Sequence, residues 1–222
     1  RDRFNKLVYE NPLAGPEDVK DFHMEGKAAI SFPRERMRME SILDSDLGQK
    51  SNFVYWCPED LPSVIKIAWE FWPLYEPGLC ILFFAARGAQ GQSIFCSSID
   101  VRTGEYGQYH HGDIDCYHLS YFRRRWEEER EFHTCNLRKS YGFHLATQGA
   151  DPIPSVPDIV GPYFMELVKD EGKIGFYINE LLVLYWEDDA KTYGPILGSG
   201  KVGFRQMSPL IAEYANMKVY TV

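Results

Sequence analysis

The stretch between His110 and Asp151 holds the densest collection of His, Tyr, Arg, Asn and Gln side chains in this 222-residue chain. Its first and last thirds alternate with a period of two residues, which is typical of strands exposed on one face. Two such strands that turn polar and aromatic groups away from a core would form a binding surface on a sheet. We therefore predict a ligand site on this part of the chain.

The first of these strands is predicted to supply an aromatic platform. Tyr117, Tyr121 and Arg123 fall on the same face of an alternating strand. Tyrosine rings stack on the C–H surfaces of sugars, and an arginine donates hydrogen bonds to hydroxyls or to a uronate carboxylate. In the alternative interpretation, the two tyrosines point into the core together with Leu119.

The second strand is predicted to supply groups that recognise a carboxylate. An apolar row is predicted from Leu137, Tyr141, Phe143 and Leu145. It leaves four polar residues on the reverse side of the strand, namely Asn136, Arg138, His144 and Gln148. Arg205, which alternates away from Val202 and Phe204, is expected to join the same polar face. A Tyr or His beside an Arg could also carry out β-elimination from a uronate, because one group removes the C5 proton and another stabilises the enolate. A structural hydrogen-bond network is the alternative.

A metal site is a weaker hypothesis. His110, His111, Asp113 and Asp115 are close enough in sequence to suggest one, but Asp and Gly in such a loop favour turn conformations. We expect no transition metal and no cofactor, and leave open a structural Ca²⁺ held by oxygen ligands. The chain has no CxxC pair, nucleophile elbow, P-loop or dinucleotide fingerprint.

Composition limits the class of protein. Apolar residues make up 45% of the chain and aromatic residues 15%, which predicts a folded core. The formal net charge of −8 argues against a nucleic-acid partner, because binding a phosphate backbone needs a basic surface. An odd count of five cysteines, mostly within predicted strands, favours reduced thiols and a cytoplasmic location. No apolar run is long enough to span a bilayer, so we expect no membrane partner. The given sequence is also compatible with a signal peptide that has already been removed. The sequence does not indicate an oligomeric state.

The elements that must position these residues are predicted to be strands. Residues 78–88 are apolar on both faces, which predicts a central strand covered on two sides. The segment SIFCSSIDV, residues 93–101, is also a candidate strand. Near the C-terminus, short turns separate YFMELVKD, KIGFYIN, LLVLYWED and KVGFRQM, as in an antiparallel meander. About twelve short strands without a linker predict one all-β domain over residues 1–222, built from two packed antiparallel sheets.

The C-terminal segments KIGFYINELLVLYWEDD, GKVGFRQM and AEYANMKVYTV resemble the closing strands of concanavalin A-like lectin/glucanase jelly rolls. The middle segments GDIDCYHLSYFRR and NLRKSYGFHLATQGADP look more closely like the uncharacterised bacterial YesU-like family of that fold. This resemblance implies a jelly-roll sandwich with a concave face suited to a sugar chain. It also implies a role in bacterial utilisation of plant polysaccharides, particularly pectic ones.

Two functions follow as hypotheses. The first is a carbohydrate-binding protein for an acidic or pectic oligosaccharide or polysaccharide. The alternative is a carbohydrate-active enzyme, either a lyase or a glycoside hydrolase, that acts on uronic-acid-containing oligosaccharides through the same face. The glucanase branch of the superfamily uses a Glu-x-Asp-x-x-Glu strand, which holds the nucleophile and the acid close together. The nearest text here is DIDCY, residues 113–117, without a Glu at either end, so a retaining glucanase of that type is not expected.

Overall fold

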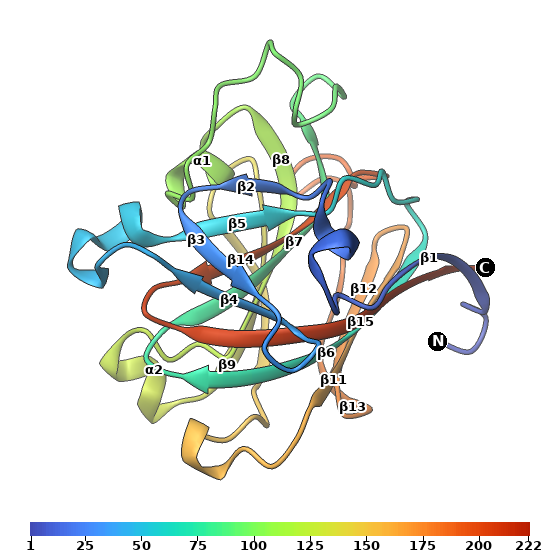
Figure 1. Ribbon diagram of the computed structural model, residues 1–222. Helices are drawn as coiled ribbons and strands as arrows, with labels where there is room; N and C mark the ends of the chain where they lie inside the picture. The colour runs from blue at the N-terminus through green and yellow to red at the C-terminus, as the bar shows by residue number, and fades with distance from the viewer.

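The computed structural model describes residues 1–222 as a sandwich of two antiparallel β-sheets (Figure 1). Sheet A contains eight strands: β1 (Lys6–Asn11), β3 (Ala28–Ser31), β4 (Met37–Ser41), β6 (Ile65–Tyr75), β11 (Tyr163–Asp170), β12 (Lys173–Ile178), β13 (Leu181–Glu187) and β15 (Ile211–Thr221). Sheet B contains seven: β2 (His23–Glu25), β5 (Phe53–Trp56), β7 (Leu79–Gly88), β8 (Ile114–Tyr121), β9 (Thr134–Lys139), β10 (His144–Ala150) and β14 (Lys201–Met207). The all-β jelly-roll prediction is confirmed.

The strand order brings distant parts of the chain together. Sheet A runs β13-β12-β11-β6-β15-β4-β3, with β1 also paired to β15, and sheet B runs β10-β9-β8-β7-β14-β5-β2. The helices are single turns or little more: η1 (Pro16–Val19), η2 (Ser45–Ser51), α1 (Gly107–His110), α2 (Glu127–Glu131) and η3 (Val156–Asp158). None of the helices is long and apolar enough to cross a membrane.

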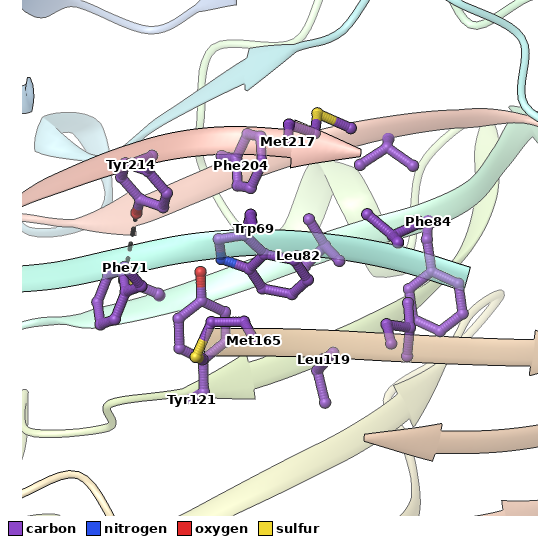
Figure 2. Packing of buried hydrophobic residues seen from close by; sticks show 14 of the residues in the cluster. Trp69, Phe71, Leu82, Phe84, Leu119, Tyr121, Met165, Phe204, Tyr214 and Met217 are labelled. Carbon is purple, nitrogen blue, oxygen red and sulfur yellow. Dashed lines mark hydrogen bonds between the residues drawn. The ribbon is translucent and has the colours of Figure 1, made fainter. Parts of the chain in front are cut away.

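The core between the sheets is formed by the inward rows of the alternating strands. On β6, every second residue from Ile65 is buried, and the residues between them are partly exposed. Figure 2 shows Trp69 of β6 among side chains from both sheets. Its ring lies 6.3 Å from that of Phe176 in sheet A and 5.9 Å from that of Tyr121 in sheet B, measured between centroids. The contact with Tyr121 joins the two sheets, and the contact with Phe176 packs neighbouring side chains on the inner face of sheet A.

Strand β7 is buried on both faces, as its sequence predicts. Its second face supports a separate cluster of 12 buried residues on the outer side of sheet B. There Phe83 stacks between Trp56 of β5 and Tyr109 of α1, with ring centroids 5.7 and 4.9 Å away. The cluster is covered by residues 89–112, which connect β7 to β8. We call this connection the cover segment.

The prediction of a strand at residues 93–101 is wrong, because this part of the cover segment forms turns and irregular backbone. Its apolar residues are nevertheless buried. Ile94 and Ile99 pack onto the outer face of sheet B. An alternating pattern does not distinguish a segment that packs on the face of a sheet from a strand that is hydrogen-bonded within the sheet.

The core predicts a clear difference between two tryptophans. Trp69→Ala should lower the free energy of unfolding by about 3–5 kcal/mol, because the side chain is 2% exposed and its removal leaves a cavity. Trp126→Ala should change it by about 0.5 kcal/mol or less, because that ring is 46% exposed. Urea unfolding followed by circular dichroism measures both. Equal losses in the two variants would contradict this assignment of the core.

Candidate functional site

The part of sheet B that the cover segment leaves open forms a cavity of about 420 Å³. Its strand residues come from four neighbouring strands: Leu79 and Ile81 of β7, Ser120 of β8, Asn136 and Arg138 of β9, and Met207 of β14. The surrounding segments contribute Gln49, Tyr106, His110, Arg123, Trp126, Glu128, Glu129 and Phe143. The cavity therefore combines an apolar base with arginines, amides and aromatic rings.

The predicted tyrosine platform is not part of this cavity. Tyr117 and Tyr121 are fully buried between the sheets, as the alternative interpretation of the sequence stated. The Tyr117 hydroxyl donates to Asp188 at 2.7 Å, and Tyr121 packs edge-on against Phe71. Both rings are structural, because an alternating strand that carries aromatic groups turns them toward the larger apolar partner surface.

Arg123 lies in the cavity although it was predicted to share a face with these tyrosines. The alternation ends one residue earlier, because Phe122 has a positive φ of 46° and is buried in the core. The backbone turns there, so Arg123 emerges on the opposite side. It donates to Thr134 Oγ1 at 2.7 Å and pairs with Glu129 at 2.8 Å.

Two other arginines at the site have no carboxylate partner. Arg138 donates to the backbone oxygen of Phe143 at 2.9 Å, and its guanidinium lies 3.6 Å from the centroid of that ring. Arg205 is completely buried beside the cavity and donates to Gly104 O and Gln49 Oε1. Burial lowers the pKa of Arg205 to about 10, which is still well above neutral pH, and burial also lowers the pKa of Arg138. A guanidinium is the most persistent cation among the side chains, so we expect both arginines to be charged.

Arg205 retains unused hydrogen-bonding capacity. Its Nη1 atom is buried and has no partner, while its guanidinium faces the ring of Tyr106 at 4.8 Å. A buried donor without an acceptor is costly. The arrangement places two cations without carboxylate partners in or beside a cavity whose lining also includes Glu128 and Glu129, in a protein that is acidic as a whole.

The remaining predicted residues divide between the cavity and its surroundings. Asn136 lines the cavity, and its amide is hydrogen-bonded at 2.7 Å to that of Gln148, which supports it from β10. His144 lies apart, with its ring stacked on Tyr193 at 4.6 Å. The register shift between Leu145 and Thr147 places His144 opposite Lys139 and Gln148 opposite Asn136, so Gln148 stays on the face of Asn136 and Arg138 while His144 does not.

Several cavity residues were not predicted from the sequence. Phe143 was assigned to an apolar row, yet it is 51% exposed and lines the cavity. Trp126 and Tyr106 come from segments outside the strands. The one sequence signal for Tyr106 and His110 is the unusual density of Gly, Tyr and His in TGEYGQYHHG, residues 103–112.

A buried histidine orients Tyr106. The Tyr106 hydroxyl is 2.8 Å from His118 Nδ1, and His118 Nε2 is 3.3 Å from Ser140 Oγ. Burial lowers the pKa of His118 to about 3, with smaller contributions from His110, Arg205 and Arg138. Burial also lowers the pKa of His110 to about 4, assisted by His111, Arg138 and Arg205. Both imidazoles are therefore neutral at pH 7.

The cover segment is fixed by a buried carboxylate. Glu25 of β2 accepts hydrogen bonds from Arg102 at 2.7 and 3.1 Å, from Trp56 Nε1 at 2.8 Å and from the Tyr109 hydroxyl at 2.9 Å. Nearby, Gly104 has a φ of +91°, and a Cβ there would lie 2.1 Å from the backbone oxygen of Asn52. Only glycine fits this close approach. These contacts place Tyr106 and His110 over the sheet.

Three of the four residues considered as metal ligands contact neighbouring protein groups instead. His110 and His111 contact each other through their Nδ1 atoms, and Asp113 accepts a hydrogen bond from the backbone of Asp100. No three His, Cys, Asp or Glu side chains are grouped so that they could hold a metal ion. The five cysteines are free, and four of them are buried.

Comparisons with known proteins agree with this architecture. A model of the family described as a domain of unknown function (DUF1961) matches residues 6–219. The uncharacterized protein YesU of Bacillus subtilis (strain 168) is 51% identical over 213 residues, which cover 96% of this chain and 94% of YesU. The crystal structure of a protein of unknown function with a galectin-like fold from Bacillus subtilis superposes on this chain with a TM-score of 0.95. The two sequences are 50% identical, and the match covers 98% of this chain and 96% of that one.

The carbohydrate-binding module CBM66 from Bacillus subtilis shares the fold at 10% identity, with a TM-score of 0.55 over 90% of this chain and 95% of the module. The predicted likeness to the YesU-like family is confirmed.

The buried His118 predicts a pH dependence of stability. Its pKa is about 3 in the folded protein against an ordinary 6.5, so between these values the unfolded chain binds a proton that the folded protein does not. Stability from this residue is complete above pH 6.5 and declines as the pH falls, by at most about 1.4 kcal/mol per pH unit. In urea unfolding between pH 7 and pH 5, His118→Gln should show a shallower decline than the wild type. Parallel curves would contradict the burial of a neutral imidazole. Contributions from carboxyl groups are common to both proteins and cancel in the comparison.

Proposed function

This chain belongs to the DUF1961 family, and we propose that it binds an acidic oligosaccharide in the cavity on sheet B. Its fold is the galectin-like jelly roll, which is also the fold of a carbohydrate-binding module. The observation that carries the proposal is the pair of arginines without carboxylate partners, Arg138 and Arg205, beside a cavity rimmed with aromatic rings.

Charge supports an anionic ligand. Arg123 is neutralised by Glu129, but the hydrogen bonds of Arg138 and Arg205 go to uncharged groups. Holding two such cations in a partly desolvated site costs free energy that a neutral sugar would not recover. A carboxylate provides a charge-assisted, geometrically matched acceptor for a guanidinium. The ligand class that fits is therefore a sugar carrying carboxylates, such as a uronic acid.

The aromatic residues support a sugar rather than a simple anion. Trp126 and Phe143 are both about half exposed, and both line the cavity. Exposed rings beside polar groups offer apolar faces for the C–H surface of a pyranose, while Asn136 and Ser120 supply hydrogen-bonding groups for hydroxyls. Galacturonic acid, the uronic acid of pectin, is the first ligand we would test.

Substitution of Arg138 tests the proposal directly. Arg138→Gln should weaken binding of galacturonic acid oligomers about tenfold or more, because a charge-assisted hydrogen bond contributes roughly 1.5–3 kcal/mol. Added salt should reduce the affinity of the wild type more than that of the variant. Calorimetric titration at two salt concentrations measures both effects.

Two further variants separate charge from stacking. Trp126→Ala should weaken acidic and neutral oligosaccharides alike, because stacking does not depend on ligand charge. Arg34→Gln removes the same charge from an exposed position in the turn between β3 and β4, where Arg34 pairs with Glu213, and should leave binding unchanged. Equal affinity of the wild type for acidic and neutral sugars would overturn the proposal of an anionic ligand.

A second candidate for the same cavity is β-elimination from a uronate. It is favoured by His110, which is neutral at pH 7 and lines the cavity together with Arg138. The imidazole would remove the C5 proton while the arginine stabilises the charge developing on the carboxylate. The C4–O4 bond would break as the C4–C5 double bond forms, and the departing O4 would take a proton from solvent.

Elimination is tested by incubating the protein with polygalacturonate and following the ultraviolet absorbance of the unsaturated product. A lyase should release that product, and His110→Gln should abolish its release while retaining binding. A wild type that binds without releasing the product would leave binding as the function of the site.

A further inference from the structure

We propose that the cavity receives the end of an acidic sugar chain and excludes the interior of a polymer. This inference rests on the proposed function, because it specifies which part of an acidic carbohydrate is bound. It is carried by the segments that surround the cavity, and above all by the cover segment. A site for the interior of a polymer must let the chain enter on one side and leave on another.

The cover segment occupies a large part of the outer face of sheet B. Ile94, Ile99 and Tyr109 are buried with residues of β5, β7 and β8 in the 12-residue cluster. This packing removes the area from any ligand and ends at the cavity, where Tyr106 and His110 form a wall. A sugar chain lying across the sheet would meet this wall.

The cover segment is not free to move aside. Its Arg102 pairs with Glu25, and the side chains of both are buried, at 5% and 3% exposure. Tyr109 and Trp56 donate to the same carboxylate, so displacing the segment would break several hydrogen bonds and leave a charge unpaired. Breaking a buried pair in this way is strongly unfavourable. The wall is therefore part of the folded structure.

Other segments limit the remaining sides. Trp126 and Glu128 come from the α2 region, which is held by the Arg123–Glu129 pair and by the fully buried pair of Arg124 and Asp151. Gln49 of η2 and Phe143 of the turn before β10 also line the cavity. In Figure 1, α1, η2 and α2 lie on the same side of the molecule, at the left of the view. A polymer crossing the site would have to leave over one of these segments.

The size of the cavity agrees with this limit. Its volume of about 420 Å³ is near the lower end of the range for small-ligand pockets, roughly 300–1,000 Å³. A pocket of this size holds a small ligand and cannot enclose a long sugar chain. We therefore expect the affinity to be set by the terminal units, with the rest of the chain outside in solvent.

The test is calorimetric titration of the whole protein with galacturonic acid oligomers, from the monomer to the hexamer, and with polygalacturonate of known mean length. Affinity should rise from monomer to dimer and change by less than about threefold beyond the trimer. The polymer should bind one protein per chain, whatever its length. Affinity that keeps rising to the hexamer, or several proteins bound along one polymer chain, would overturn the inference.

Modified trimers identify the end that is bound. One carries an alditol at the reducing end, and the other an unsaturated unit at the non-reducing end. One of the two should bind at least about tenfold more weakly than the unmodified trimer. If both bind as the unmodified trimer does, the inference is wrong, although the proposed function stands. If no oligomer or polymer binds at any length, the proposed function itself fails, and this inference fails with it.

Discussion

The shape of the outer face of sheet B depends on the hydrogen bonds and the ion pair made by the buried carboxylate of Glu25. A charge removed from water is stable only when it is paired and its remaining lone pairs are satisfied, and Arg102, Trp56 and Tyr109 meet both conditions. Because these partners come from β5 and from the cover segment, the same contacts fix that segment on sheet B. The sheet thus has a second buried cluster on its outer face, and the candidate cavity is the part of that face that remains open.

A second constraint is the charge distribution around that cavity. The chain carries a net charge of −8, yet three arginines lie in or beside a single cavity, and only Arg123 is paired with a carboxylate. Arg138 and Arg205 are held instead by backbone oxygens, by the Gln49 amide and by aromatic faces. Such an arrangement tolerates the cations without neutralising them. Cations positioned before a ligand arrives are what the proposed binding of an anionic group requires.

His118 and the close approach of Gly104 to Asn52 both help to fix the position of Tyr106. His118 is neutral and holds the Tyr106 hydroxyl, while the guanidinium of Arg205 lies against the Tyr106 ring. Gly104, which accepts from Arg205, can approach Asn52 only because it lacks a side chain. Tyr106 is thereby fixed on several sides, and the wall of the cavity has a defined place relative to the strands.

The sequence by itself determined the fold class, most of the strands and part of the candidate site. Alternation with a period of two identifies strands and separates their faces. For this reason Asn136 and Arg138 are correctly placed on one face, and β7 is correctly predicted to be covered on both faces.

Only the tertiary structure decided which face of β8 is inward. Both faces carry aromatic or polar groups, and the choice depends on the partner sheet that buries Tyr117 and Tyr121. Local backbone breaks at Phe122 and within β10 reassigned Arg123 and His144, because one irregular residue reverses every later side chain. Tyr106 and Trp126 reach the cavity through contacts between segments far apart in the chain, such as Glu25 with Arg102, and no local pattern encodes those contacts.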